Sequence, residues 1–176
     1  IRKLEPQDAL SFVEFFEDMD FQHNEFWRGC YCQYYHLQGS IEKWIETRGE
    51  KARNMALINV ARAYTQGYLA LDGERIVGWC HVNHQAKLLR LTEFLQPWLG
   101  EGKTAVVACF MVHPAYRRQG IAGQLLEAAV QGCQEEGFSA IIGLPSKENP
   151  IPEREYHGRA ALYERLVFQR VAEIEG

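Results

Sequence analysis

Apolar residues occupy nearly every position from 105 to 112, where the chain reads AVVACFMV. A continuous run of this length is typical of a central strand that is buried on both faces. Pro114 cannot donate a hydrogen bond to a neighbouring strand, so we expect the strand to end near His113. The pattern therefore predicts a buried strand over residues 105–112.

The pattern changes to a helical period directly after a short basic turn at residues 117–123, which reads RRQGIAG. Gly137 has the position of a C-cap, and a second apolar run follows at residues 138–144. We predict a strand–turn–helix–strand unit whose turn lies at the strand's carboxyl end, where open α/β sheets bind ligands. The apolar stripe of the predicted helix comprises Ile121, Leu125, Ala128, Ala129 and Gly132.

Three further patterns extend this layout. Residues 67–83 alternate around an Asp-Gly pair at 72–73, as in a β-hairpin. Residues 40–48 and 50–64 have helical spacing, and residues 88–99 have the spacing of a short helix. The apolar face predicted for the helix at 50–64 comprises Met55, Leu57, Ile58, Val60 and Ala61.

Composition narrows the class of protein without deciding it. A chain of 176 residues with 47% hydrophobic content is long enough for one compact domain, which we expect to span 1–176. The net charge of −4 predicts no general affinity for nucleic acid, and we expect no membrane-spanning segment. Five cysteines fit reduced thiols, so we expect the protein to work in the cytoplasm.

The basic turn has the features of a phosphate-binding site. It places main-chain N–H groups, the start of a helix and the guanidinium groups of Arg117 and Arg118 around one spot. Gly120 and Gly123 have no side chain to keep a ligand from the main chain. Arginine pairs are often only solvated, but beside a glycine-rich helix start we expect them to face phosphates. Neither GxxxxGK[ST] nor GxGxxG occurs, which disfavours nucleotide-hydrolase and dinucleotide sites.

The spacing Arg117-x-x-Gly120-x-Ala122, preceded by a Val-His-Pro turn, resembles the GNAT superfamily of acetyl-CoA-dependent N-acetyltransferases. The resemblance extends to residues 1–9, the hairpin, and residues 159–168, where Val167 stands in place of the family's glycine. It implies an α/β fold with a mixed central sheet flanked by helices. It also implies acetyl-CoA as co-substrate. The residues that it implies for cofactor binding are Met111, Val112, Arg117, Arg118, Gln119, Gly120, Ile121, Ala122, Gly123 and Asn149, although Asn149 could equally belong to a plain turn.

The resemblance implies acylation of an amine by direct attack in a ternary complex. We expect the pantetheine arm to pair with an open edge of the strand at 105–112, and the main-chain N–H of Met111 or Val112 to stabilise the oxyanion. Tyr163 has the position from which the family protonates the departing thiolate, although such a tyrosine is often only part of the core. The strand contains no carboxylate, so no general base stands out. The candidates are Glu93, Glu148, His81 and His157.

Residues 21–36 are rich in aromatic side chains and contain Cys30 and Cys32. Their spacing matches no common zinc motif, so we expect no metal and predict an aromatic wall over the substrate cleft with buried thiols. Together with a Gly-Trp-Cys sequence at 78–80, the Cys-Tyr-Cys segment resembles a poorly characterised branch of the superfamily.

Other interpretations of the sequence stay open at this point. The alternative function is a non-catalytic acyl-CoA-binding sensor or scaffold module, because no carboxylate lies on the predicted central strand. A metal-dependent or redox protein built on Cys30 and Cys32 is a third class. For the enzyme we expect a small-molecule or peptide amine as acceptor, and a homodimer is possible.

Overall fold

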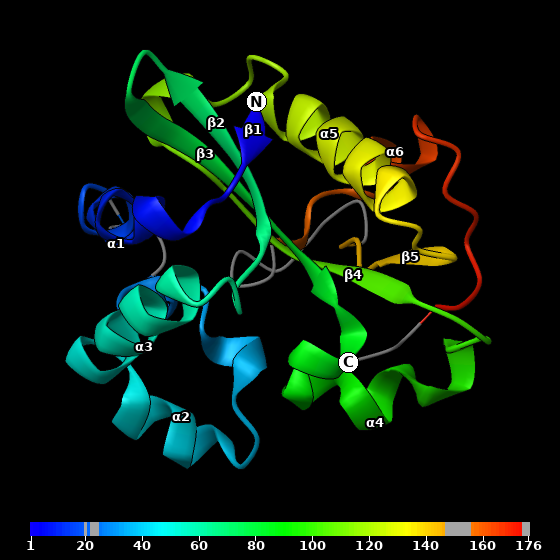
Figure 1. Cartoon of the computed structure of the whole chain (residues 1–176), viewed down its shortest axis with the longest axis horizontal. Coiled ribbons are helices and arrows are strands. Elements are labelled where there is room, and N and C mark those ends of the chain that lie inside the picture. The colour runs from blue at the N-terminus through cyan, green and yellow to red at the C-terminus, as the bar shows by residue number, and fades with distance from the viewer. Residues whose placement is uncertain (20, 22–24, 147–155, 174–176) are drawn as a thin grey trace.

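The computed structural model describes residues 1–19, 21, 25–146 and 156–173. Five strands form one sheet in the order β1-β2-β3-β4-β5 (Figure 1). The first four are antiparallel neighbours, and β4 and β5 are parallel. Their bounds are β1 Arg2–Lys3, β2 Gly67–Asp72, β3 Arg75–His84, β4 Thr104–Val112 and β5 Ala140–Gly143.

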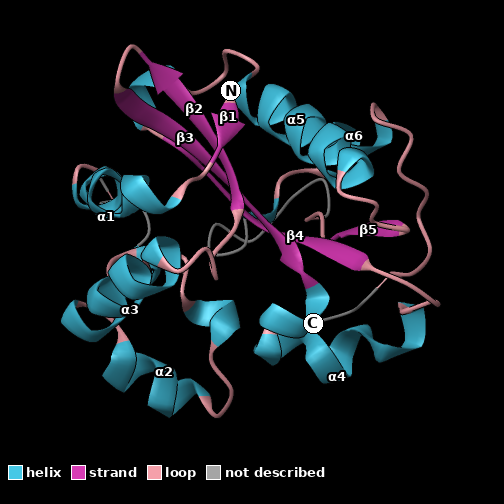
Figure 2. Ribbon diagram, viewed as in Figure 1, coloured by secondary structure: helices cyan, strands magenta, loops and turns pink. Residues whose placement is uncertain are grey.

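Helices cover both faces of this sheet (Figure 2). On one side lie α1 (Ala9–Glu17), α2 (Ile41–Thr47) and α3 (Glu50–Ala61), and on the other α5 (Ile121–Glu135) and α6 (Ala160–Glu164). The mixed, helix-flanked α/β sheet predicted from the sequence is therefore confirmed. The helix α4 (Thr92–Leu95) lies beyond the carboxyl end of β3. Among the described residues, no helix combines the length and apolar character needed to cross a membrane.

The central strand is as buried as its composition predicts, since every residue of β4 except Val112 is buried. Alternation sends its side chains to two faces. Phe110 packs with α5 in one apolar cluster, whereas Cys109 and Met111 pack with α1 and α3 in another. The turn at 117–123 therefore joins a largely buried strand to a helix that is packed on the sheet.

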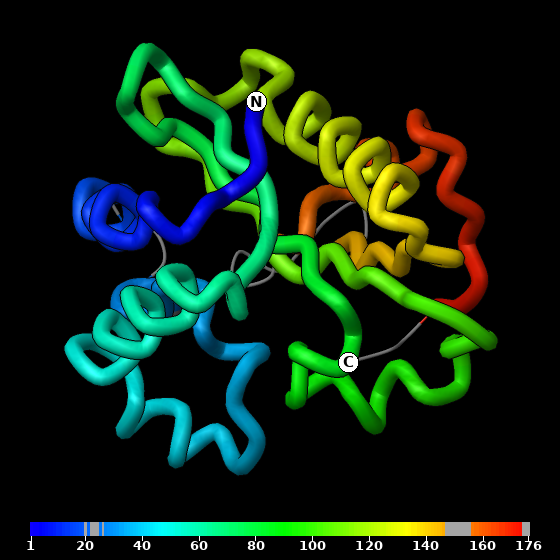
Figure 3. The backbone as a smooth tube through the Cα atoms, in the orientation of Figure 1, coloured from blue at the N-terminus to red at the C-terminus, as the bar shows by residue number. Residues whose placement is uncertain are grey.

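Three predicted elements differ in detail from the structure. The buried face of α3 consists of Ala52, Ala56 and Val60, whereas Ile58 is half exposed. The helix packs chiefly against α1 and the 3-10 turn at Pro6–Asp8. The helix expected at 88–99 is divided into two 3-10 turns around the four-residue α4. The C-terminal helix α6 is shorter than expected, and residues 156–173 run past α5 and β5 (Figure 3).

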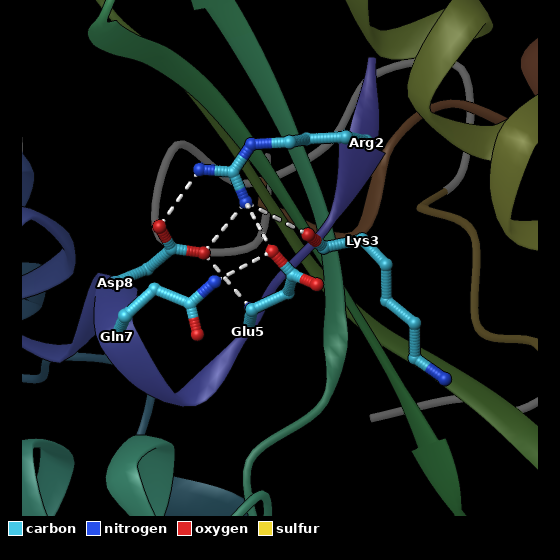
Figure 4. Close-up of polar contacts among 5 residues, drawn as sticks. All are labelled: Arg2, Lys3, Glu5, Gln7 and Asp8. Atoms are coloured by element: carbon cyan, nitrogen blue, oxygen red, sulfur yellow. Dashed lines mark hydrogen bonds and ion pairs between the residues drawn. The ribbon is translucent and has the colours of Figure 1, made fainter.

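A cluster of polar contacts fixes the first strand to the first helix (Figure 4). The guanidinium of Arg2 donates two hydrogen bonds to the carboxylate of Asp8, at 2.6 and 2.7 Å, and the main-chain N–H of Glu5 donates a third at 2.8 Å. These hydrogen bonds, chiefly those from Arg2, lower the pKa of Asp8 although partial burial opposes the shift. The charged carboxylate is therefore the form that stabilises the fold.

We expect Asp8→Asn to lower the free energy of unfolding at neutral pH by about 1–2 kcal/mol, a range discounted for the exposed Arg2. Because the pKa is lower in the folded state, this contribution is complete above the unfolded pKa of about 3.9 and is lost as the pH falls below it. Urea denaturation between neutral and acid pH measures the effect. Asp18→Asn is the control, since its carboxylate is exposed. An equal loss in both variants at neutral pH would contradict the assignment.

Candidate functional site

The edge of β4 that faces β5 is open over the second half of the strand. Pairing with β5 runs from Thr104, opposite Ala140, only as far as Val107, opposite Gly143. No strand of the described residues pairs with that edge from Ala108 to Val112. On the other edge, His81 of β3 lies opposite Cys109 whereas Val82 lies opposite Val107, so Ala108 of β4 is the extra residue of a β-bulge. Because a bulge bends a strand and increases its twist, it accounts for the departure of β4 from β5.

The register identifies which main-chain groups face the open edge. His113 donates its N–H to Val77 O at 2.9 Å, toward β3. Main-chain groups alternate between the two edges along an antiparallel strand, so the N–H of Met111 also points to β3. Those of Phe110 and Val112 point to the open edge. Of the two oxyanion donors expected from the sequence, only Val112 therefore has the required orientation.

The turn after β4 is held in an unusual backbone conformation. Arg117 donates from Nε to Val112 O at 3.1 Å, which holds the turn against the strand end. Arg118 and Gly120 both have left-handed backbones, with φ of 61° and 80°. Gln119 donates from Nε2 to Ala115 O at 3.3 Å. These bonds and dihedral angles fold the chain back on itself immediately before α5 begins.

This conformation exposes a row of hydrogen-bond donors. None of the main-chain N–H groups from Arg118 to Gly123 has an acceptor among the described residues, whereas that of Gln124 donates to Gly120 O at 3.2 Å. Such groups at a helix start attract anions, and α5 adds its dipole. The exposed guanidinium of Arg118 has no partner among the described residues. The predicted residues from Arg117 to Gly123 thus lie around one turn beside Val112, and its exposed donors suit an anion.

The remaining predicted site residues are placed differently. Asn149 and the base candidate Glu148 lie outside the described residues. Met111 lies beside the turn, but its side chain is buried against α1 and α3. Glu93 lies on the short α4. Whether these residues bind cofactor or move a proton stays a prediction.

Tyr163 lies between β4 and β5, beside the point where their pairing ends. Its ring meets Phe110 edge-on, with ring centroids 6.2 Å apart, and a Cβ added to Gly143 would lie 2.3 Å from the Tyr163 ring. The hydroxyl donates to His157 O at 2.8 Å. Burial raises the pKa of Tyr163 well above its usual value, so the hydroxyl stays protonated. Both interpretations from the sequence, acid and core residue, are compatible with this position.

Aromatic side chains of residues 21–36 pack with Tyr156 and His157, and their predicted role as a wall over the substrate cleft stays a prediction. The hydroxyl of Tyr35 lies 3.3 Å from the Tyr156 hydroxyl and 3.3 Å from His157 Nε2. Trp27 meets Tyr156 edge-on. Sequence patterns missed Tyr156, because it contacts these side chains from more than a hundred residues further along the chain.

The thiols of this segment belong to no recognised metal-binding group in the described part of the chain. Within the described ranges, no three His, Cys, Asp or Glu side chains are arranged to hold a metal ion. All five cysteines are free, and Cys32 is buried, as expected for thiols that pack as small apolar groups.

Comparisons with known proteins agree with the fold. Residues 15–166 match the family model described as "Acetyltransferase (GNAT) family". The chain is similar to a crystal structure of a ribosomal-protein-alanine N-acetyltransferase from Brucella melitensis biovar Abortus 2308, at 15% identity and a TM-score of 0.55, over 99% of this chain and 95% of that one. No curated protein matches the sequence significantly.

Two similar crystal structures contain the expected co-substrate or its product. One is an aminoglycoside N-acetyltransferase in complex with CoA, at 13% identity and a TM-score of 0.57, over 99% of this chain and 90% of that one. The other is a predicted acetyltransferase with acetyl-CoA from Clostridium acetobutylicum, at 14% identity and a TM-score of 0.54, over 99% and 92%.

The fold and the family match define an acyltransferase that uses acetyl-CoA. The chain belongs to the GNAT acetyltransferase family. Membership favours an enzyme over the alternative of a non-catalytic binding module.

We expect Gly120→Val to abolish measurable acetyl-CoA binding while the protein stays folded. A Cβ at this position meets no protein atom within 4 Å, so it would project into the space proposed for the diphosphate. The left-handed backbone adds a stability cost of about 1–2 kcal/mol. Isothermal titration calorimetry measures the affinity.

Gly137→Val is the matched control at the other end of the same helix. Gly137 has φ of 72° and equally open surroundings, so the backbone cost is similar. We expect this variant to bind acetyl-CoA as tightly as the wild type. Unchanged affinity in Gly120→Val, or equal losses in both variants, would rule out the turn as the binding site.

Proposed function

We propose that this protein transfers the acetyl group of acetyl-CoA to an amine, by direct attack of the amine on the thioester in a ternary complex. The observation that supports this most is the open edge of β4, which leads directly into a turn of N–H groups without acceptors among the described residues. An open strand edge that is followed directly by an anion site suits a ligand with an amide-bearing arm and a phosphate at its end.

The strand edge orients the thioester in this proposal. The pantetheine amides pair with the open main-chain edge of β4 around Phe110, as an added strand would. The diphosphate lies against the N–H groups of Gly120 to Gly123, with Arg118 beside it. Fixing both ends of the arm holds the thioester against the open edge of β4.

Acetyl transfer requires a donor for the developing oxyanion and a free amine. The N–H of Val112 is rigid and faces the open edge, so it donates to the thioester oxygen with little reorganisation. A lysine-like amine has a pKa of about 10.4 in water, so a group of the protein must accept its proton at neutral pH.

Tyr163 supplies the proton for the departing thiolate. Its raised pKa keeps the hydroxyl protonated, and its ring lies between Phe110 of the open strand and Gly143 of β5. In this step the hydroxyl turns from His157 O, the acceptor that it has in the structure, toward the sulfur.

The acceptor is a small-molecule or peptide amine. We propose a screen of amino acids, polyamines, aminoglycosides and peptides with N-terminal alanine, because aminoglycoside and ribosomal-protein-alanine acetyltransferases are among the similar structures. Release of the free CoA thiol is measured with each amine against acetyl-CoA in water alone. If no amine raised the rate above that baseline, the proposed function would be wrong.

We expect Tyr163→Phe to lower kcat by about 100-fold while the KM for acetyl-CoA stays within error, because only the proton donor is lost. Tyr68→Phe is the control, since it removes a half-buried hydroxyl that lies against Gly132 of α5. Steady-state kinetics with the best amine of the screen measure both. An unchanged kcat in Tyr163→Phe would leave Tyr163 as a core residue only.

Four properties stay predictions of the sequence. These are the single domain over 1–176, the cytoplasmic location, the absence of nucleic-acid and membrane partners, and the possible homodimer.

A further inference from the structure

Two thiols and an imidazole meet on the α1–α3 face of β4. Cys32 Sγ lies 3.4 Å from His81 Nδ1. His81 belongs to β3 and stands directly opposite Cys109 of β4 in the sheet register. Cys109 shares its face with Met111, on the part of β4 whose other edge is open. The group therefore lies beside the point proposed for the thioester.

The His81 ring has an unexplained polar atom. The residue is fully buried, and Nε2 has no hydrogen-bond partner among the described residues. His36 lies against the same ring, with ring centroids 5.0 Å apart, but both of its ring nitrogens have hydrogen-bond partners. Its Nδ1 donates to Lys87 O and its Nε2 accepts from Thr65, and burial lowers the pKa of His36 to about 3. His36 is thus a satisfied structural histidine, whereas His81 keeps one nitrogen unused.

The chain adopts a strained conformation to bring Cys32 to this place. Tyr31 and Cys32 are consecutive left-handed residues, with φ of 44° and 56°. For residues other than glycine each such conformation costs about 1–2 kcal/mol. A polar network holds it: the fully buried Gln33 donates to Tyr31 O at 3.0 Å and accepts from Asn59 of α3 at 2.7 Å. Strain of this kind is concentrated at functional sites.

The surroundings favour a thiolate at Cys32. Burial alone would raise the pKa of Cys32, but hydrogen bonds from the Cys109 thiol and the His81 ring outweigh it and lower the pKa well below the usual value. The same contact with Cys32, together with burial, raises the pKa of Cys109. Cys32 therefore loses its proton first, and Cys109 keeps its own.

The other titratable groups around the pair are neutral at pH 7. Burial raises the pKa of Cys30 to about 12 and that of Tyr156 to about 12. It raises those of Cys80 and Tyr35 well above their usual values. His36 is neutral as well, so none of these five groups competes with the Cys32 thiolate for the incoming proton.

We propose that Cys109, backed by the Cys32–His81 pair, accepts the proton of the acceptor amine. This rests on acetyl transfer to an amine, as proposed above. The ammonium N–H bond breaks and its proton passes to the Cys109 sulfur, while the proton of Cys109 passes to the Cys32 thiolate. No carbon–sulfur bond forms. The reverse transfer through Cys109 to water resets the pair, and β4 needs no carboxylate.

The thiolate is tested without any substrate, from the ultraviolet absorbance of thiolate as the pH is raised. We expect the wild type to show one thiolate at neutral pH that Cys32→Ser lacks. His81→Gln removes the ring donor, so we expect its titration to move to higher pH. Cys133→Ala is the control, because this buried thiol lies on α5 and should leave the neutral-pH signal unchanged. An identical titration in wild type and Cys32→Ser would overturn the inference.

The proton role is tested by kinetics with the best amine of the screen. We expect Cys32→Ser and Cys109→Ala to lower kcat by about 100-fold at neutral pH with the KM for acetyl-CoA unchanged. Their rates should recover as the pH approaches the pKa of the amine, because the amine then arrives unprotonated. Cys133→Ala should keep the wild-type profile. Parallel pH profiles in the wild type and Cys32→Ser would assign the pair a structural role and overturn the proposal.

Two further outcomes separate this inference from the proposed function. An acetyl group found on Cys32 or Cys109 by mass spectrometry after incubation with acetyl-CoA would assign the thiols to covalent transfer and overturn the proton role. Absence of CoA release with every amine would contradict the proposed function, and the proton role with it. An ordinary thiol titration with normal amine-dependent release would contradict only the present inference.

Discussion

The pairing of β4 with β5 stops halfway along β4, and the rest of the site depends on that interruption. A strand in the middle of a sheet normally satisfies its main-chain groups on both edges, because a buried N–H without an acceptor costs about 1–3 kcal/mol. Beyond Val107 the edge toward β5 has no partner strand among the described residues. The edge is rigid, since β3 holds the opposite side through Val112. A fixed row of unused hydrogen-bonding groups is what an extended amide-bearing ligand requires.

The alternation of side chains along β4 then separates two kinds of chemistry. Phe110 faces α5 and meets Tyr163, a protonated phenol. Cys109 faces α1 and α3 and belongs to the thiol–imidazole group. The proposed proton donor and the proposed proton acceptor thus lie on opposite faces of one strand. The two faces give these groups different environments, which raise the pKa of Tyr163 and lower the pKa of Cys32.

The local parts of this arrangement could be predicted from the sequence, and the non-local parts could not. The buried strand, the turn and the helix that follows are written in consecutive residues from Ala105 to Glu135, so periodicity and turn chemistry predict them. The open edge cannot be predicted from these residues, because it depends on where β5 ends and on where the register between β3 and β4 shifts. The contact of Cys32 with His81 joins residues 49 positions apart, and only the fold brings them together.

Val167 and Cys32 both have left-handed backbones, and the two residues differ in what their side chains contact. Val167 occupies the family's glycine position and has φ of 60°, a conformation that a β-branched side chain adopts only at a cost. The fold therefore keeps the shape that glycine permits and tolerates the strain in an exposed residue. Cys32 shows the same compromise inside the core, where the strained residue also makes the contact with His81. Strain at Val167 carries no such contact. The importance of a residue with a left-handed backbone therefore depends on its side-chain contacts, and the sequence pattern does not reveal these contacts.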